Sequence, residues 1–195
     1  MTAVQDYHSR LSDPASRKMG TFSYLPEMTP EQIRKQIEWI VKNLKPGGQA
    51  LVVVPDGLLI QSAVLEYLVK TCQVQAIISL PLRTFYSTAK KTYILALSKL
   101  LPGQPPSAQP VFTYLASEIG ESRDNYRFPI DEDDLDTAAN LFNQFKGAPT
   151  AFANLDPRCK IWSASDLHSA TNWLVERRWT TDEKTALGIV EQTVE

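Results

Sequence analysis

An α/β fold built on a buried, largely parallel sheet is predicted by three features of this sequence. Residues Gln49–Val54 form a continuous apolar run, which is typical of a strand buried on both faces between layers of helices. A helical pattern and a second apolar run, Val74–Leu80, follow, and the order strand, helix, strand predicts a right-handed parallel crossover. The chain has 195 residues, of which 43% are hydrophobic and 22% charged, which is enough for one globular domain with a sizeable core.

The helix before the first strand has a clear start and a clear end. Thr29 and Gln32 match a capping box, in which each side chain binds the backbone N–H of the other residue. Gly47 and Gly48 end the helix in a sharp turn. The apolar positions between these signals recur at helical spacing: Ile33, Ile37, Ile40, Val41 and Leu44.

Two more strands and three more helices are expected after the second strand. The apolar segments Tyr93–Lys99 and Val111–Leu115 are predicted to be strands, and the Pro- and Gly-rich segment between them, LLPGQPPSAQ, permits a long hairpin. The acidic run Asp131–Asp136 favours the start of a helix that ends at Gly147, because carboxylates complement the positive end of the helix dipole. Two short helices are predicted near Ser165–Val175 and Thr180–Val190.

These elements divide the chain into three segments. Residues 1–28 are irregular, with Pro14, Gly20 and Pro26 as breakers. Residues 29–147 hold the α/β domain, and residues 148–195 are expected to form a small helical C-terminal extension.

Composition and charge exclude several classes of protein. The formal net charge of -2 gives no overall attraction to nucleic acid, so any DNA contact requires a local basic patch. The two cysteines, Cys72 and Cys159, provide no disulfide framework, and together with His8 and His168 they have no metal-ligand spacing. The acidic run lacks the glycine and the distal glutamate of a calcium loop, so no metal site is expected. No signal peptide or membrane span is recognisable, and we expect a cytoplasmic protein.

The loop between the second and third strands is the strongest candidate for a binding site. Phe85 and Tyr86 lie there beside the cations Arg83, Lys90 and Lys91. Aromatic rings that alternate with cations suit an unstacked base and its phosphates, because the rings stack on the base and the cations neutralise the backbone. The alternative is that Phe85 seals the edge of the core while the lysines are merely solvated.

A second candidate lies where the first strand ends, at Pro55 and Asp56. Ligands of open α/β sheets bind beyond the carboxyl ends of parallel strands, so this turn is expected to line a ligand cleft. The alternative, favoured on general grounds, is that Asp56 caps the helix that follows.

The block from Leu44 to Lys99, LKPGGQALVVVPDGLLIQSAVLEYLVKTCQVQAIISLPLRTFYSTAKKTYILALSK, resembles the C-terminal half of the catalytic domain of adenine-N6 DNA methyltransferases. Among these enzymes, it resembles the modification subunits of type I restriction systems. The resemblance implies the second half of a Rossmann-like class I methyltransferase sheet. It also implies methyl transfer from S-adenosyl-methionine to adenine N6 in DNA, with Phe85 near the flipped adenine and Arg83, Lys90 and Lys91 on the DNA backbone.

Two motifs of that family are missing from this sequence. The family binds S-adenosyl-methionine through an Asp-Pro-x-x-Gly-Ser-Gly-type loop, whereas Asp13-Pro14 is followed here by Ala-Ser-Arg. The catalytic Asn-Pro-Pro-aromatic motif has no counterpart, since Pro105-Pro106 is preceded by Gln104 and followed by Ser107. We therefore expect no catalytic residue in this chain and no binding of S-adenosyl-methionine by the chain alone. A truncated gene, a gene-prediction fragment and half of a split enzyme are three open explanations.

Other interpretations remain open at this point. The chain could be a non-catalytic, DNA-contacting or scaffold subunit that docks on a partner carrying the missing half. Under the resemblance, its expected partners are DNA and either a specificity subunit or the complementary methyltransferase half. A different Rossmann-like protein that shares the Pro-Gly-Gly turn is the third possibility.

Overall fold

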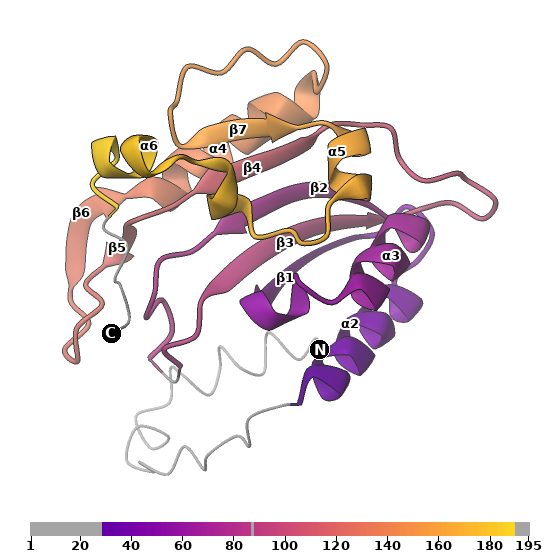
Figure 1. The fold of residues 1–195 in the computed structure, drawn as a ribbon, viewed down its shortest axis with the longest axis horizontal. Helices are drawn as coiled ribbons and strands as arrows, with labels where there is room; N and C mark the ends of the chain where they lie inside the picture. Colours follow the sequence, from indigo (N-terminus) through magenta and orange to yellow (C-terminus); the bar gives the residue numbers. More distant parts are fainter. Residues whose placement is uncertain (1–28, 87, 190–195) are drawn as a thin grey trace.

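The computed structural model describes residues 29–86 and 88–189, which form a five-stranded mixed sheet with helices on both faces and a separate two-stranded sheet (Figure 1). The helical elements are α2 (Pro30–Asn43), η2 (Asp56–Leu58), α3 (Ser62–Thr71), α4 (Asp134–Gly147), α5 (Ala164–Ser169), η3 (Val175–Arg178) and α6 (Thr181–Ala186). The strands are β1 (Gln49–Pro55), β2 (Cys72–Ser79), β3 (Thr92–Lys99), β4 (Val111–Leu115), β5 (Ile119–Glu121), β6 (Pro129–Asp133) and β7 (Cys159–Trp162).

The main sheet has the strand order β1-β3-β2-β4-β7. Strand β3 runs antiparallel to both β1 and β2, so these two strands are parallel to each other, as the strand–helix–strand pattern predicts. They are not neighbours, however, because β3 lies between them. Strand β4 is parallel to β2, and β7 closes the far edge antiparallel to β4.

The expected hairpin between the third and fourth strands is wrong. Strand β4 pairs with β2 rather than with β3, so the segment of residues 100–110 carries the chain past the end of β2. The reason is that both edges of β3 are already filled, by β1 on one side and β2 on the other. The remaining edge of β2 accepts β4, whose five residues are all buried.

The C-terminal segment, residues 148–195, is more than the helical extension that the pattern predicts. It supplies α5 and α6, but also β7, a strand of four residues that is too short to stand out in the sequence. Strand β7 covers the edge of β4, and the Thr113 hydroxyl donates a 2.6 Å hydrogen bond to the Lys160 carbonyl across this pair. The segment is therefore part of the sheet and of its core.

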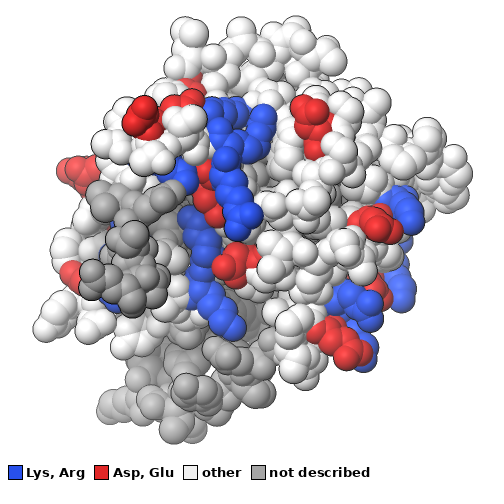
Figure 2. Space-filling view, in the orientation of Figure 1, with Lys and Arg blue, Asp and Glu red and all other residues white. Residues whose placement is uncertain are grey.

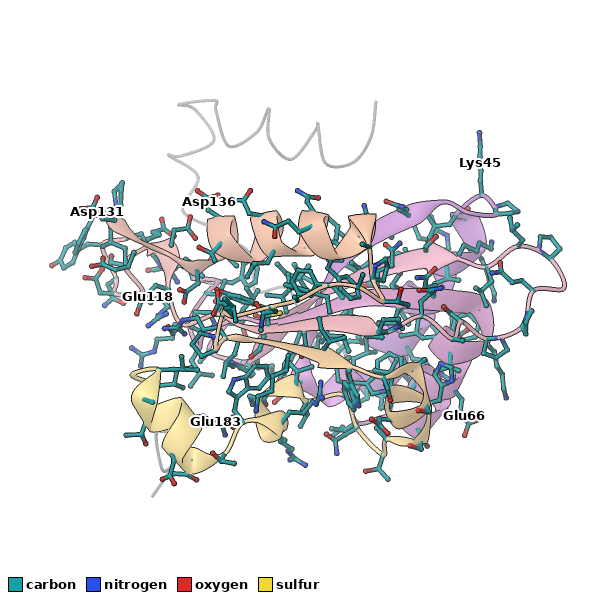
Figure 3. All side chains as sticks on the ribbon, turned by 90° about the horizontal axis from the view of Figure 1, so that it is seen from above. Lys45, Glu66, Glu118, Asp131, Asp136 and Glu183 are labelled. Atoms are coloured by element: carbon teal, nitrogen blue, oxygen red, sulfur yellow. The ribbon has the colours of Figure 1, made fainter. Side chains whose placement is uncertain are left out.

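The two faces of the sheet are covered differently. We call the face that carries α2, α3, α5 and η3 the front face, and the face that carries α4 the back face. Figure 3 shows α4 on one side of the sheet and α5 and α6 on the other. The front core joins residues of all these elements, including Ile37, Leu68 and the fully buried Trp173. On the back face, Phe145 of α4 packs against Phe112 of β4 with ring centroids 5.8 Å apart.

The helix starts follow the predicted chemistry. Thr29 and Gln32 form both hydrogen bonds of the capping box at α2. The Asp133 side chain accepts a 2.8 Å hydrogen bond from the Leu135 N–H and caps α4, as expected for the acidic run. These caps satisfy backbone groups that would otherwise lack partners at the first turn.

The β1 end of the back face is left uncovered by the described elements. Within residues 29–86 and 88–189, β1 has one strand neighbour, β3. Alternate residues of β1 that point to the back face are exposed, with Leu51 at 75% and Val53 at 49%. An apolar strand with a free edge is a surface that normally pairs with further structure.

Candidate nucleic-acid interface

The carboxyl ends of the parallel strands β1, β2 and β4 meet at one edge of the sheet, on the left of Figure 1. This is the edge at which open α/β sheets bind ligands. The turn after β1 and the loop after β2 are joined there, because the Asp56 N–H donates a 3.1 Å hydrogen bond to the Lys91 carbonyl. The sequence-predicted residues therefore come together at a single edge.

The loop after β2 presents its aromatic residues to solvent. The Phe85 side chain is 39% exposed and the Tyr86 side chain is 78% exposed. The Thr84 hydroxyl donates a 2.7 Å hydrogen bond to the Pro81 carbonyl and tightens the turn. Tyr86 is displayed rather than packed, and Phe85 is only partly covered, which favours the binding interpretation of this loop over a core seal.

Arg83 has a left-handed backbone conformation, with φ of 60°. Non-glycine residues rarely adopt this region, and they keep it where surrounding contacts hold them there. The contact here comes from Arg127, on the turn between β5 and β6. Its guanidinium donates one hydrogen bond of 2.5 Å to the Arg83 carbonyl and another of 3.1 Å to the Thr84 carbonyl.

The two lysines of the loop have different surroundings. Lys90 is exposed. The Lys91 ammonium instead donates a hydrogen bond to the Leu80 carbonyl and lies 5.8 Å from the centroid of the Tyr93 ring. Burial lowers the pKa of Lys91 from its ordinary value. Lys91 thus holds the β2–β3 connection together, and we no longer place it on the DNA backbone.

The turn at Pro55 and Asp56 lies at the ligand edge, but its carboxylate is used locally. The Asp56 side chain accepts a 2.7 Å hydrogen bond from the Gly57 N–H at the start of η2. The alternative interpretation, in which Asp56 caps the following helix, is wrong, because the N-cap of η2 is Pro55 and that of α3 is Gln61. The Asp56 side chain remains exposed at this edge of the sheet.

A buried polar cluster underlies this edge on the front face. The Tyr93 hydroxyl donates a 2.7 Å hydrogen bond to the Glu176 carboxylate and so ties η3 to the sheet. Burial, and then the Glu176 charge, raise the pKa of Tyr93 far above its ordinary value, so the phenol stays protonated. The second Glu176 oxygen is buried and has no hydrogen-bond partner among the described residues.

Cations from distant parts of the sequence gather near this edge. Figure 2 shows a band of Lys and Arg side chains, interspersed with carboxylates, across the middle of the front face. Arg123 and Lys184 lie close enough to Lys91 to contribute to the lowering of its pKa, and Arg177 acts on Tyr93. Sequence reasoning missed this local basic patch, because its members come from the β5–β6 turn, η3 and α6.

The β5–β6 turn is the other feature that sequence reasoning missed. Its residues Tyr126 and Phe128 are 89% and 52% exposed, and they flank Arg127. The segment Ser122–Phe128, SRDNYRF, has the same alternation of cations and aromatic rings as the loop after β2. That alternation was the available signal, but the turn lies too far along the sequence to be joined to the loop without the fold.

Other candidate sites are weaker in the described part of the chain. A groove of about 500 Å³ lies between β7 and α6, but its main charges, Lys160 and Glu183, pair with each other at 2.8 Å. Within residues 29–86 and 88–189, no group of three or more His, Cys, Asp or Glu side chains could hold a metal ion. Over the same residues, no helix is long and apolar enough to cross a membrane.

One comparison matches a short stretch of the chain to a different kind of protein. Over 43 residues, which are 22% of the chain, the sequence is 72% identical to the ribulose bisphosphate carboxylase small subunit of Rhodobacter capsulatus. The small subunit of Thiobacillus denitrificans is 66% identical over 41 residues. The chain spans only about a third of the length of these relatives, 36% and 35%, so the match does not assign it to their family.

Solved structures show the same fold as the chain. A structure from a study of complex assembly and conformational transition of the type I R-M system superposes with a TM-score of 0.56 at 17% identity, covering 81% of this chain and 36% of that one. A modification subunit of a putative type I restriction enzyme from Vibrio vulnificus YJ016 superposes with a TM-score of 0.52 at 20% identity. This pair covers 69% of this chain and 28% of the Vibrio subunit. The chain therefore spans about a third of the length of these proteins.

The family model described as N-6 DNA Methylase matches residues 7–172, well over half of the chain. The matched region includes the whole main sheet, the aromatic loop after β2 and the β5–β6 turn. The mixed α/β sheet, the modification-subunit folds that superpose on it and this match agree, and the chain belongs to the N-6 DNA methylase family.

Proposed function

We propose that this chain supplies the base-side edge of an S-adenosyl-methionine-dependent DNA adenine-N6 methyltransferase of a restriction-modification system in the cytoplasm. The observation that carries the proposal is the exposure of Phe85 and Tyr86 after β2, at the ligand edge of the sheet, next to the Arg83 carbonyl that Arg127 binds. An enzyme that modifies a base must take it out of the helix, and exposed rings then offer it a stacking surface. Exposed Arg83 and Lys90 are placed to contact phosphates beside those rings.

On this proposal, the methyl donor is bound by the complementary methyltransferase half and not by the residues of this sequence. The chain carries neither the glycine-rich cofactor loop nor the Asn-Pro-Pro-aromatic motif, so it would not bind S-adenosyl-methionine alone. Its own contribution is to position the base, which lowers the barrier by fixing the reacting groups in place. We therefore assign it base-contacting and DNA-backbone residues, and no catalytic residue.

The companion polypeptide is the complementary methyltransferase half, with a specificity subunit as a further partner of the assembly. Two observations support this assignment. The chain spans only 28–36% of the modification subunits whose fold it shares. The outer edge of β1, which no strand of the described residues pairs with, and the exposed Leu51 and Val53 beside it offer a surface to an additional strand.

Replacing Phe85 by Ala tests the proposed site. The purified chain should bind a single-stranded, adenine-rich oligonucleotide, and Phe85→Ala should lose about 1–3 kcal/mol of stacking free energy. Leu155→Ala is the matched control, because Leu155 is a fully exposed apolar residue beside the groove between β7 and α6. Oligonucleotide affinity is measured by fluorescence anisotropy. Equal affinities of the Phe85→Ala variant and the unmodified chain would show that the ring only covers the core.

In a reconstituted enzyme, the same substitution should also discriminate between substrates. Phe85→Ala should cost less on duplexes whose target adenine is already unpaired, because less extrusion energy has to be recovered. A uniform loss on paired and unpaired targets would argue against a role in base capture.

A non-catalytic, DNA-contacting scaffold subunit is the alternative function. The neighbouring reading frames discriminate the two. A frame that encodes the glycine-rich loop and the Asn-Pro-Pro-aromatic motif without this sheet edge supports a split enzyme. A complete methyltransferase encoded alongside supports an accessory subunit.

Association with ribulose bisphosphate carboxylase is a second candidate function, favoured by a separate observation. The 72% identity over 43 residues to a small subunit far exceeds the 17–20% identity to the modification subunits, which points to two ancestries within one chain. Gel filtration of the chain mixed with the purified Rhodobacter capsulatus carboxylase tests this candidate. Co-elution supports it, and separate elution at micromolar concentrations removes it.

A further inference from the structure

The turn between β5 and β6 displays two aromatic side chains beside the proposed base-side loop. Tyr126 is 89% exposed and Phe128 is 52% exposed, against 39% and 78% for Phe85 and Tyr86. Arg127, which lies between Tyr126 and Phe128, reaches the backbone of the other loop at the Arg83 and Thr84 carbonyls. Four exposed rings from two distant segments are thus carried by two turns in direct contact.

Arg127 is held firmly in the position that joins these turns. Its side chain is only 15% exposed and pairs with Glu121 at 3.4 Å. Its backbone is left-handed, with φ of 52°, and its partner Arg83 is left-handed as well. Two strained residues that contact each other need surrounding contacts to hold them, and such residues gather at functional sites.

The turn itself is rigidly built. The Asp124 carboxylate accepts hydrogen bonds from the Tyr126 N–H at 2.9 Å and from the Arg127 N–H at 3.1 Å. The Ser122 N–H donates to the Phe128 carbonyl at 2.9 Å, and the Ser122 hydroxyl accepts from the Phe128 N–H at 3.1 Å. Exposed aromatic rings on a preorganised turn lose little conformational entropy when they bind a partner.

The charges of the turn decide which part of a nucleic acid suits it. Glu121 and Asp124 are used internally, by Arg127 and by the backbone. Arg123 pairs with Glu118 at 3.4 Å, while Asp131 and Glu132 on β6 stay exposed. This acidic surplus disfavours phosphates at the turn. The planes of unstacked bases are uncharged and suit the two rings.

We propose that the β5–β6 turn is the second wall of the base-side site. Arg127 is a positioning residue that holds the Phe85–Tyr86 loop in its exposed conformation. Tyr126 and Phe128 stack on unstacked bases that neighbour the target base. The inference rests on the proposed function, because it takes DNA as the ligand of this edge.

Substitutions at Tyr126 and Phe128 test the stacking role, with a single-stranded adenine-rich oligonucleotide as the probe. Tyr126→Ala and Phe128→Ala should each weaken binding about tenfold. The slope of log affinity against log salt concentration should stay unchanged, because no phosphate contact is lost. Leu155→Ala is the matched control and should bind like the unmodified chain.

Hydrogen exchange of the chain without DNA tests the positioning role. Arg127→Gln should speed amide exchange in the Arg83–Tyr86 segment about tenfold, since the forked contacts to two carbonyls are lost. Arg127→Lys should restore part of the protection through one of them. Arg34→Gln, the same change on the surface of α2, is the control and should leave this segment unchanged.

A double-substitution cycle shows whether Arg127 acts through the ring it positions. Arg127→Gln should weaken oligonucleotide binding in the unmodified chain, but add little in a Phe85→Ala background. Fully additive losses, or unchanged loop exchange in Arg127→Gln, would overturn the positioning role. Normal binding by Tyr126→Ala and Phe128→Ala, while Phe85→Ala binds weakly, would overturn the stacking role alone. Absence of oligonucleotide binding by the unmodified chain would overturn the proposed function together with this inference.

Discussion

Lys90 and Lys91 are neighbours in sequence, yet we expect their replacement to have opposite consequences. The Lys91 ammonium is turned inward, onto the Leu80 carbonyl and the Tyr93 ring. The Lys90 side chain is exposed at the ligand edge of the sheet. Lys91→Ala is therefore expected to reduce the stability of the fold, and Lys90→Ala to reduce DNA binding.

The sizes of the two effects follow from these contacts. Lys91→Ala leaves the Leu80 carbonyl without its donor, which costs about 1–3 kcal/mol when the group is buried. The lost cation–π contact adds about 0.5–2 kcal/mol, and relief of the buried charge offsets part of the sum. We expect a net loss of roughly 1–3 kcal/mol in the free energy of unfolding. Lys90→Ala should instead reduce the salt slope of single-stranded DNA binding by about 0.7, the contribution of one phosphate contact.

Two assays separate these outcomes. Urea unfolding followed by tryptophan fluorescence gives the free energy of unfolding, and fluorescence anisotropy over a salt series gives the slope of DNA binding. Lys70→Ala is the matched control, because Lys70 is an exposed residue of α3 that pairs only with Glu66, at 3.6 Å. It should change the free energy of unfolding by no more than a few tenths of a kcal/mol and leave the salt slope of DNA binding unchanged.

The reasoning is refuted if Lys91→Ala unfolds at the same urea concentration as the unmodified chain while its salt slope falls. That result would mean that the Lys91 ammonium contacts a phosphate and that its hydrogen bond to the Leu80 carbonyl does not stabilise the β2–β3 connection. An unchanged salt slope in Lys90→Ala would remove Lys90 from the DNA backbone.

Three further predictions concern the rest of the molecule. The purified chain should not transfer tritiated methyl groups from S-adenosyl-methionine to DNA, because it lacks the cofactor loop and the catalytic asparagine motif. Methyl transfer above a heat-killed control would contradict the proposal that the complementary methyltransferase half carries the methyl-transfer site. The double substitution Leu51→Lys and Val53→Lys should suppress concentration-dependent self-association in analytical ultracentrifugation, because charges on an exposed apolar edge strand block edge-to-edge pairing. Self-association as strong as that of the unmodified chain would show that another surface causes it. Burial raises the pKa of the Cys159 thiol to about 12 and also raises the pKa of the Cys72 thiol. At pH 8 both thiols should therefore be unreactive towards Ellman's reagent in the folded chain and should react at once in guanidinium. Rapid labelling of the folded chain would contradict their burial.

The local elements of the fold were predictable because their signals are local. The capping box at Thr29 and Gln32, the apolar run of β1 and the acidic start of α4 each depend on residues within a few positions of one another. The expected burial of β1 on both faces is wrong, because no described element covers Leu51 and Val53. The family resemblance, confirmed by the match over residues 7–172, also rests on contiguous sequence. The aromatic-cationic composition of the loop after β2 could be identified in the same way.

Strand pairing was not predictable in this way. Whether β4 pairs with β3 or with β2 depends on which strand edges are already filled, and that is a property of the assembled sheet. The pairing of β7 with β4 joins residues more than forty positions apart, through a strand too short to carry its own pattern. The expected hairpin failed for the first reason, and the description of the tail as helical was incomplete for the second.

The sequence by itself determined which residue types stand at the ligand edge, and the tertiary structure decided what each of them contacts. It turned Lys91 inward and left Lys90 exposed, although the two are chemically identical neighbours, because side chains at successive positions entering a strand point in different directions. It also brought Arg127 to the carbonyls of Arg83 and Thr84 across more than forty residues. A hydrogen bond of this kind depends on positions fixed by the whole sheet, so no pattern within either segment could reveal it.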